Sequence, residues 1–130
     1  MPQTKLPESQ SVQDFLKAVY TLQEECERVS TNALAEALSI SAPSVTDMAG
    51  RLCDVGLLDY RKHRGVKLTQ IGEKTAQNVI RRHELIEQFL VEHLGYNPGE
   101  AHQEAELMEH VASDKFVEAL ALRLTATERA

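Results

Sequence analysis

Apolar residues recur at helical spacing over three stretches in the first half of the chain. They predict helices over residues 11–25, 31–38 and 41–55. Serines stand where the second and third helices begin, and a hydroxyl there caps the free N–H groups of a first turn. Ser11 takes the same place before the first helix. Residues 1–10 are polar, hold two prolines and show no period, so we expect a loosely held arm.

Two short apolar runs, residues 57–60 and 66–68, follow the third helix and predict a β-hairpin whose basic loop turns at Gly65. The two helices within residues 31–55 have the outline of a helix-turn-helix. A hairpin placed directly after such a pair is typical of a wing. We therefore predict a winged helix-turn-helix that binds double-stranded DNA, with phosphate contacts from the hairpin residues Arg61, Lys62, Arg64 and Lys67.

Three further helical patterns cover residues 69–93, 100–111 and 113–124. The first would be on the order of 35 Å long, enough to link the DNA-binding head to a second module. On this helix, Arg81 and Arg82 continue the run of basic residues that begins in the hairpin. The last two helices carry apolar stripes that would be more stable in a symmetric homodimer.

The predicted fold class is mainly α, with a winged helix-turn-helix domain over residues 11–72 joined by a long helix to a helical domain over residues 73–130. No apolar run approaches 18 residues and no charged-then-apolar leader is present, so we expect a soluble cytoplasmic protein. Cys26 and Cys53 lack a C-x-x-C spacing, which favours reduced, buried thiols.

The charge is divided along the chain. The net charge is −6, yet residues 51–83 hold eight of the 14 Lys and Arg against three acids, whereas residues 84–130 hold ten acids against three bases. This division fits a chain whose middle meets phosphate and whose end attracts cations. An uneven but fully solvated surface is the alternative from charge alone.

Acidic groups concentrate in the segment E-A-E-L-M-E-H at residues 104–110. If the segment is helical, Glu106, Glu109 and His110 stand at i, i+3 and i+4 and share one face. Such a cluster binds a cation, forms a hydrogen-bonded network or lies in solvent. Asp14 likewise has an ordinary explanation, as the acid of a capping box opened by a serine.

The order of these parts resembles the diphtheria toxin repressor family of metal-dependent transcriptional repressors. The likeness rests on the winged helix at residues 30–68, R-H-E-L-I-E-Q-F-L at residues 82–90 and the segment at residues 104–110, and it covers residues 11–124. The chain is similar to the short manganese-responsive branch, which lacks the additional C-terminal domain of iron-responsive members. The resemblance implies a repressor of metal-uptake genes.

The resemblance implies Mn²⁺ or Fe²⁺ as the cofactor, with Zn²⁺ or Co²⁺ as ions that bind in vitro. Oxygen-rich ligands with one or two imidazoles suit that choice. Lys17 stands where the manganese branch has a second acid, so we do not expect two ions side by side at the primary site. We expect the second ion near His83, Glu87 and His102 instead. The primary ligand candidates implied by the resemblance are Asp14, His83, Glu106, Glu109 and His110.

A cation bound by residues of both domains would couple metal binding to the relative position of these domains. Asp14 belongs to the head and the acidic segment to the dimerisation module, so metal would favour one spacing of the two recognition helices, near the ~34 Å between successive major grooves. A palindromic DNA site would match such a dimer. In the recognition helix, small groups and hydroxyls suit thymine methyls, bases and phosphates, which selects Ala42, Pro43, Ser44, Thr46 and Asp47.

Two rival functions are weighed against this hypothesis. A di-iron carboxylate enzyme needs Glu-x-x-His on two helices, yet no histidine here has an acid three residues before it, and no H-E-x-x-H occurs. We therefore expect that the protein is not an enzyme. A winged-helix regulator that senses an organic ligand or a protein partner would use the acidic segment only as an interface network.

Overall fold

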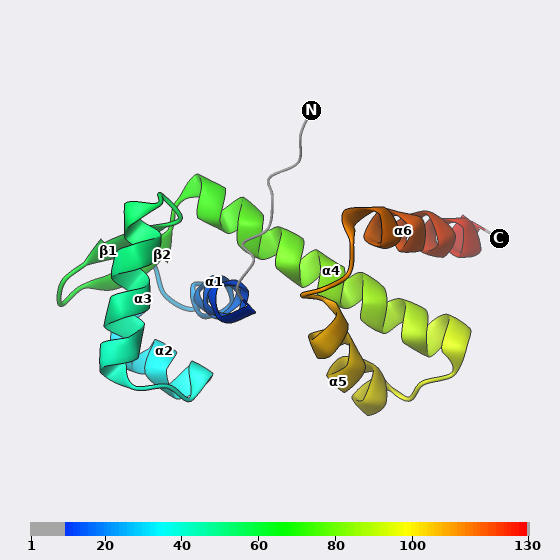
Figure 1. The fold of residues 1–130 in the computed structure, drawn as a ribbon, viewed down its shortest axis with the longest axis horizontal. Coiled ribbons are helices and arrows are strands. Elements are labelled where there is room, and N and C mark those ends of the chain that lie inside the picture. The colour runs from blue at the N-terminus through cyan, green and yellow to red at the C-terminus, as the bar shows by residue number, and fades with distance from the viewer. Residues whose placement is uncertain (1–9, 130) are drawn as a thin grey trace. The chain divides into compact units, whose positions relative to one another are not determined.

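The structure is a computed structural model that describes residues 10–129. Within these residues the chain forms six helices and one antiparallel pair of strands, so the fold is mainly helical, as predicted (Figure 1). None of the described helices is both long and apolar enough to cross a bilayer. The elements in chain order are α1 (Gln10–Leu22), α2 (Thr31–Leu38), α3 (Ala42–Asp54), β1 (Leu58–Arg61), β2 (Gly65–Leu68), α4 (Gln70–Leu94), α5 (Pro98–Met108) and α6 (Asp114–Arg129).

Helices α2 and α3 form the helix-turn-helix, and serines define both of its starts. The hydroxyl of Ser30 accepts the N–H of Ala33, and the hydroxyl of Ser41 accepts the N–H of Ser44. Ser39 ends α2 with a left-handed backbone, φ 56°. Each cap satisfies an N–H that the first helical turn leaves without a partner, so these local signals fix the turn between the two helices.

The N-terminal unit, which extends to Asn78, has a single apolar core built from all of its elements. Side chains of this core are at most 6 % exposed, and burying each of its Phe, Leu and Val side chains stabilises the fold by about 1.5–3 kcal/mol. They come from α1 (Phe15, Leu16, Val19), the segment before α2 (Val29), the helix-turn-helix (Leu34, Val45, Ala49, Leu52), the hairpin (Leu58, Val66, Leu68) and α4 (Ala76).

The hairpin is fastened to the segment before α2. The N–H of Val29 donates to the carbonyl of Val66 at 2.8 Å, and the reverse bond measures 2.9 Å. Arg28 adds hydrogen bonds to the carboxylate and carbonyl oxygens of Asp59 and to the carbonyl of Gly65. These bonds hold the root of the wing while its tip extends into solvent.

The C-terminal unit begins at Val79, inside α4, and has a core of its own. Helix α4 ends before Gly95, whose φ is 76°. Asn97 and Glu100 then form a reciprocal capping box at the start of α5. This start places α5 against α4. The residues at the centre of the unit's core are Ile86, Leu90, Ala101, Ala105 and Leu120.

Several predicted details are wrong. Helix α1 is already formed at Gln10, so Ser11 lies within it instead of capping it; the remainder of the predicted arm falls outside the described residues. Helix α5 ends at Met108, because the chain turns there toward α6. Cys26 is exposed in the irregular segment after α1, and Cys53 is half-buried on α3.

Candidate metal centre

Three side chains that could bind a metal ion converge where α5 packs on α4. His83 and Glu87 lie one turn apart on α4, and His102 reaches them from α5. The Nε2 atom of His83 lies 2.8 Å from Oε2 of Glu87 and 3.2 Å from Nδ1 of His102. The third side of this triangle, between His102 Nδ1 and Glu87 Oε2, is 3.2 Å. The spacing of His83 and Glu87 was visible in the sequence.

The triangle has the dimensions of one face of a metal coordination sphere. An octahedral ion with ligand bonds of about 2.1 Å holds adjacent donor atoms about 3.0 Å apart. The three separations in the protein bracket that value. The donor set consists of two imidazole nitrogens and one carboxylate oxygen, with no sulfur. Such a set suits Mn²⁺ and Fe²⁺ and also binds Zn²⁺. The residues present therefore fit the implied ion.

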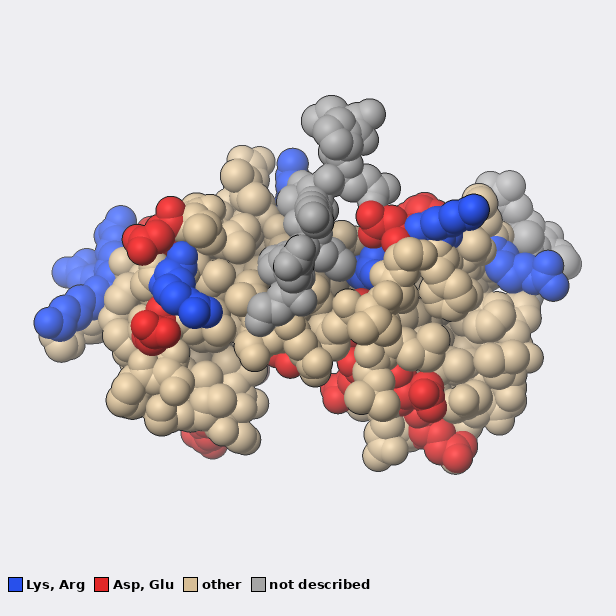
Figure 2. All heavy atoms as spheres, in the orientation of Figure 1, with Lys and Arg blue, Asp and Glu red and all other residues tan. Residues whose placement is uncertain are grey.

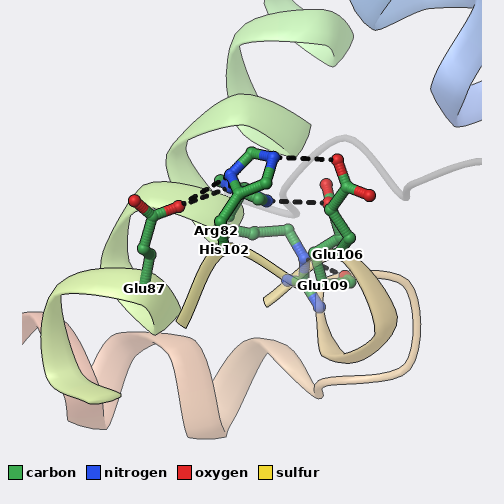
Figure 3. A network of polar contacts seen from close by, with 6 residues as sticks. Arg82, Glu87, His102, Glu106 and Glu109 are labelled. Atoms are coloured by element: carbon green, nitrogen blue, oxygen red, sulfur yellow. Dashed lines mark hydrogen bonds and ion pairs between the residues drawn. The ribbon is translucent and has the colours of Figure 1, made fainter. Parts of the chain in front are cut away.

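Each imidazole is oriented by a glutamate on its other side. Nδ1 of His83 lies 2.9 Å from Oε1 of Glu109, and Nε2 of His102 lies 3.2 Å from Oε1 of Glu106 (Figure 3). A carboxylate accepts from an imidazole N–H, and both ring nitrogens of His83 face one, because Nε2 lies 2.8 Å from Oε2 of Glu87. Two imidazole nitrogens and a carboxylate oxygen that converge this closely require a cation or a shared proton.

The inner half of this network is buried. Glu109 is 1 % exposed and His83 9 % exposed, whereas Glu106 and His102 reach the surface. A buried carboxylate is costly unless it is paired and hydrogen-bonded, so the bond from His83 is part of what keeps Glu109 inside. The centre thus has a buried side and a side that is open to solvent.

Arg82 also belongs to this network, so the prediction that it continues the basic surface is wrong. It is 3 % exposed; its Nε donates to the carbonyl oxygen of Glu109 at 3.2 Å, and its Nη1 lies 3.0 Å from the carboxylate of Asp114. The apolar spacing could have shown this, because Arg82 stands three residues after Val79 and four before Ile86, both buried. Arg81 does face solvent, where it pairs with Glu118.

The remaining ligand candidates lie in different parts of the chain. Glu106 is on α5, Glu109 is the C-cap of this helix and keeps a helical backbone, and His110 lies in the turn that follows. Asp14 and Lys17 lie half-buried on α1, in the N-terminal unit. The described structure brings together His83, Glu87, His102, Glu106 and Glu109.

The predicted DNA-contacting residues are placed on accessible surface. Ala42, Pro43, Ser44, Thr46 and Asp47 are all exposed at the start of α3. At the wing, Arg61, Lys62 and Arg64 are exposed, and Lys67 is half-buried 3.9 Å from Glu27. Figure 2 shows Lys and Arg gathered at the wing and acidic side chains over the C-terminal unit.

Two family models match successive parts of the chain. Residues 9–66 match the model described as "Iron dependent repressor, N-terminal DNA binding domain". Residues 69–129 match "Iron dependent repressor, metal binding and dimerisation domain". The candidate metal centre lies within the second match, and the helix-turn-helix lies within the first.

Curated relatives span most of the chain. The uncharacterized HTH-type transcriptional regulator MJ0568 of Methanocaldococcus jannaschii is 37% identical over 113 residues, which are 86% of this chain and 90% of that protein. The HTH-type transcriptional regulator MntR of Oceanobacillus iheyensis is 38% identical over 77% of this chain and 67% of its own length. Both are transcriptional regulators by name.

Solved structures share the fold and a substantial part of the sequence. The manganese regulator SloR is 42% identical with a TM-score of 0.74, over 88% of this chain and 53% of that one. A manganese-dependent transcriptional repressor in complex with manganese is 40% identical with a TM-score of 0.78, over 88% of this chain and 52% of that one. The chain therefore spans about half the length of these solved proteins.

Proposed function

We propose that this chain, which belongs to the iron-dependent repressor family, represses metal-uptake genes when Mn²⁺ or Fe²⁺ binds it. Family membership explains the order of parts, a DNA-binding domain followed by a metal-binding and dimerisation domain. The relatives named above are transcriptional regulators, which agrees with the expectation that the chain is not an enzyme. A DNA partner also supports the proposed cytoplasmic location.

The observation that carries the proposal is the triangle of His83, Glu87 and His102. Its three donor atoms are 2.8–3.2 Å apart and two of them belong to imidazoles that are each oriented by a glutamate. Metal-ligating histidines almost always donate their second N–H to such a partner. A regulator that ignores metals would have no need for this arrangement, so the metal-independent alternative is not favoured.

We assign the chain two ions. The triangle would hold one, and the other would use the primary candidates that the sequence supplies, namely Asp14, Glu106, Glu109 and His110. Mn²⁺ or Fe²⁺ fits the oxygen-rich donors, and Zn²⁺ or Co²⁺ would also bind in vitro. When bound, such an ion supplies positive charge that compensates the clustered carboxylates. Asp14 is included in this second set of ligands only because of its position in the sequence.

Metal would control DNA binding through differential affinity. An ion that binds more tightly to the DNA-competent arrangement of the homodimer shifts the population toward it, and DNA binding raises metal affinity by the same factor. The exposed start of α3 would read base edges, and the wing cations would contact phosphate. A two-fold dimer predicts a palindromic operator.

A selection from random double-stranded DNA tests this function. The full chain, stripped by a chelator, is offered the same library with Mn²⁺, with Mg²⁺ or with chelator alone. We expect a palindromic sequence to be enriched only with Mn²⁺, and its affinity to fall at least tenfold when chelator is added. Equal enrichment under all three conditions would establish the metal-independent regulator instead.

A further inference from the structure

The wing of this protein is too small to fix its own orientation. Strands β1 and β2 have 4 residues each, and an isolated two-stranded hairpin is marginally stable in water. The direction of its tip relative to α3 therefore depends on bonds at its root. These bonds bear on the proposed function, because the wing cations and the start of α3 would contact the same DNA duplex.

Arg28 lies in the segment before α2 and bonds to both strands of the hairpin. Its Nη2 donates to the carbonyl oxygen of Asp59 in β1 at 2.9 Å and to that of Gly65 in β2 at 3.2 Å. Its Nη1 donates to Oδ2 of Asp59 at 3.3 Å. The Arg28 side chain is 16 % exposed, so these bonds compete less with water than those of a fully exposed ion pair. One guanidinium thus ties β1 and β2 to the segment that leads into the helix-turn-helix.

The carboxylate of Asp59 connects this anchor to a cation of the wing. Its Oδ2 accepts from Arg28, and its Oδ1 lies 3.7 Å from Nε of Arg61. Arg61 is the last residue of β1, and its side chain is 61 % exposed. Asp59 therefore links a half-buried cation at the root of the wing to an exposed cation at its tip.

We propose that Arg28 and Asp59 are positioning residues of the DNA-binding wing. By fixing β1 and β2, they direct Arg61, Lys62 and Arg64 to phosphates of the duplex that α3 reads. Asp59 accordingly raises DNA affinity, although its own carboxylate repels phosphate. This inference rests on the proposed DNA-binding function, and it concerns residues outside the candidate metal centre.

A second acid at the root of the wing gives a matched comparison. Asp59 lies 3.7 Å from Arg61, and Glu27 lies at a similar distance, 3.9 Å, from Lys67. The Glu27 side chain is 85 % exposed, and in the described part of the chain only the carboxylate of Asp59 is bonded to Arg28. If the two acids acted by charge alone, removing either would strengthen DNA binding, because each lowers the positive potential of the wing. The proposal predicts opposite signs for the two changes.

The first test measures how the full chain binds a labelled DNA duplex of mixed sequence, at neutral pH and constant Mn²⁺. Contacts to phosphate need no particular sequence. A titration at concentrations far above Kd gives the active fraction of each protein, so unfolded molecules are not counted as weak binding. We expect Glu27→Gln to bind as tightly as wild type or more tightly. Asp59→Asn should bind about three- to tenfold more weakly, because wing cations leave the phosphates.

The second test uses Arg28→Lys, which keeps the charge but cannot reproduce the guanidinium fork. The slope of log affinity against log salt should become shallower by about 0.9 for each wing cation that leaves a phosphate. The double change Lys62→Gln and Arg64→Gln should weaken binding strongly in wild type and little in Arg28→Lys. Arg81→Lys is the matched control, because Arg81 pairs with Glu118 in the C-terminal unit, and it should leave affinity and slope unchanged.

Three results would overturn the proposal. The first is an unchanged salt slope in folded Arg28→Lys, and the second is tighter binding by Asp59→Asn, as expected for Glu27→Gln. The third is an equal loss from the Lys62 and Arg64 change in both backgrounds, because the wing would then contact DNA without its anchor. If Arg28→Lys does not fold, the signs of Asp59→Asn and Glu27→Gln decide. Equal binding after chelation would refute metal control and leave these comparisons valid, whereas a wild type that binds no duplex would refute both proposals.

Discussion

At the residue scale, the candidate metal centre is organised around a carboxylate that water does not reach. Glu109 is 1 % exposed, and His83 and Arg82 meet its two ends. Burying a carboxylate costs free energy, and its hydrogen bonds can in return orient another side chain. In this protein the oriented side chain is His83, whose second nitrogen faces Glu87 and His102.

The sequence predicted some of these residues better than others. His83 and Glu87 stand one helical turn apart, so a single helix brings them together. His102 lies on another helix, and only the family resemblance connected it to them. Arg82 was assigned to the basic surface because charged residues are seldom buried. Its spacing from Val79 and Ile86 indicates burial, but its partners lie at the end of α5 and the start of α6, which periodicity does not describe.

Asp59 is expected to make the N-terminal unit sensitive to acid. The hydrogen bond from Arg28 holds the pKa of Asp59 below its usual value of 3.8. A lowered pKa in the folded state stabilises the fold at pH values above 3.8, and this stabilisation is lost as the pH falls through the folded-state pKa. The stability difference between wild type and Asp59→Asn should therefore be constant near neutral pH and shrink below pH 3.8.

Urea unfolding at a series of pH values measures this difference. Asp54→Asn, an exposed change at the end of α3, serves as the control and should follow wild type more closely. If the wild type and Asp59→Asn differ by the same amount at pH 3 as at pH 7, the ion pair with Arg28 does not stabilise the wing.

At the scale of single elements, caps determined which boundaries could be predicted. Helices α2 and α3 begin beside Ser30 and Ser41, whose hydroxyls make the expected bonds. The end of α5 has no such signal, because the acidic pattern continues through Glu109 while the chain already turns to reach α6. Tertiary packing determines where α5 ends, so the local sequence pattern does not predict this boundary.

The wing depends on a close backbone approach at Gly65. Its φ is +87°, and a Cβ there would collide with the carbonyl of Val29, to which Val66 is bonded. Gly56 has a similar φ of +84° but open space around it. We expect Gly56→Ala to cost about 1–2 kcal/mol from the backbone conformation alone. Gly65→Ala should cost clearly more, because the segment before α2 must also move.

Thermal and urea unfolding of both variants give the two free energies. Equal losses would mean that the contact with Val29 is readily relaxed and that only the backbone conformation matters. The pair separates the two causes, since Gly56 precedes β1 and Gly65 begins β2 of the same hairpin.

At the scale of the whole molecule, the division of charge corresponds to a division of function. The basic residues of the wing belong to the part that matches a DNA-binding domain, and the acidic residues belong to the part that matches a metal-binding domain. Helix α4 is continuous across the boundary between the two compact units. The mainly helical fold and its two parts were predictable because both apolar periodicity and charge change along the chain.

The most direct test of the account is a titration of the chelator-stripped chain with Mn²⁺, with free ion followed by its EPR signal. The comparison is between wild type, Glu87→Gln and the control Glu92→Gln, an exposed change on the same helix. We predict two ions per chain in wild type and in Glu92→Gln, and one in Glu87→Gln. Binding in Glu87→Gln that equals wild type, or no binding in any of the three, would contradict a metal centre at His83, Glu87 and His102.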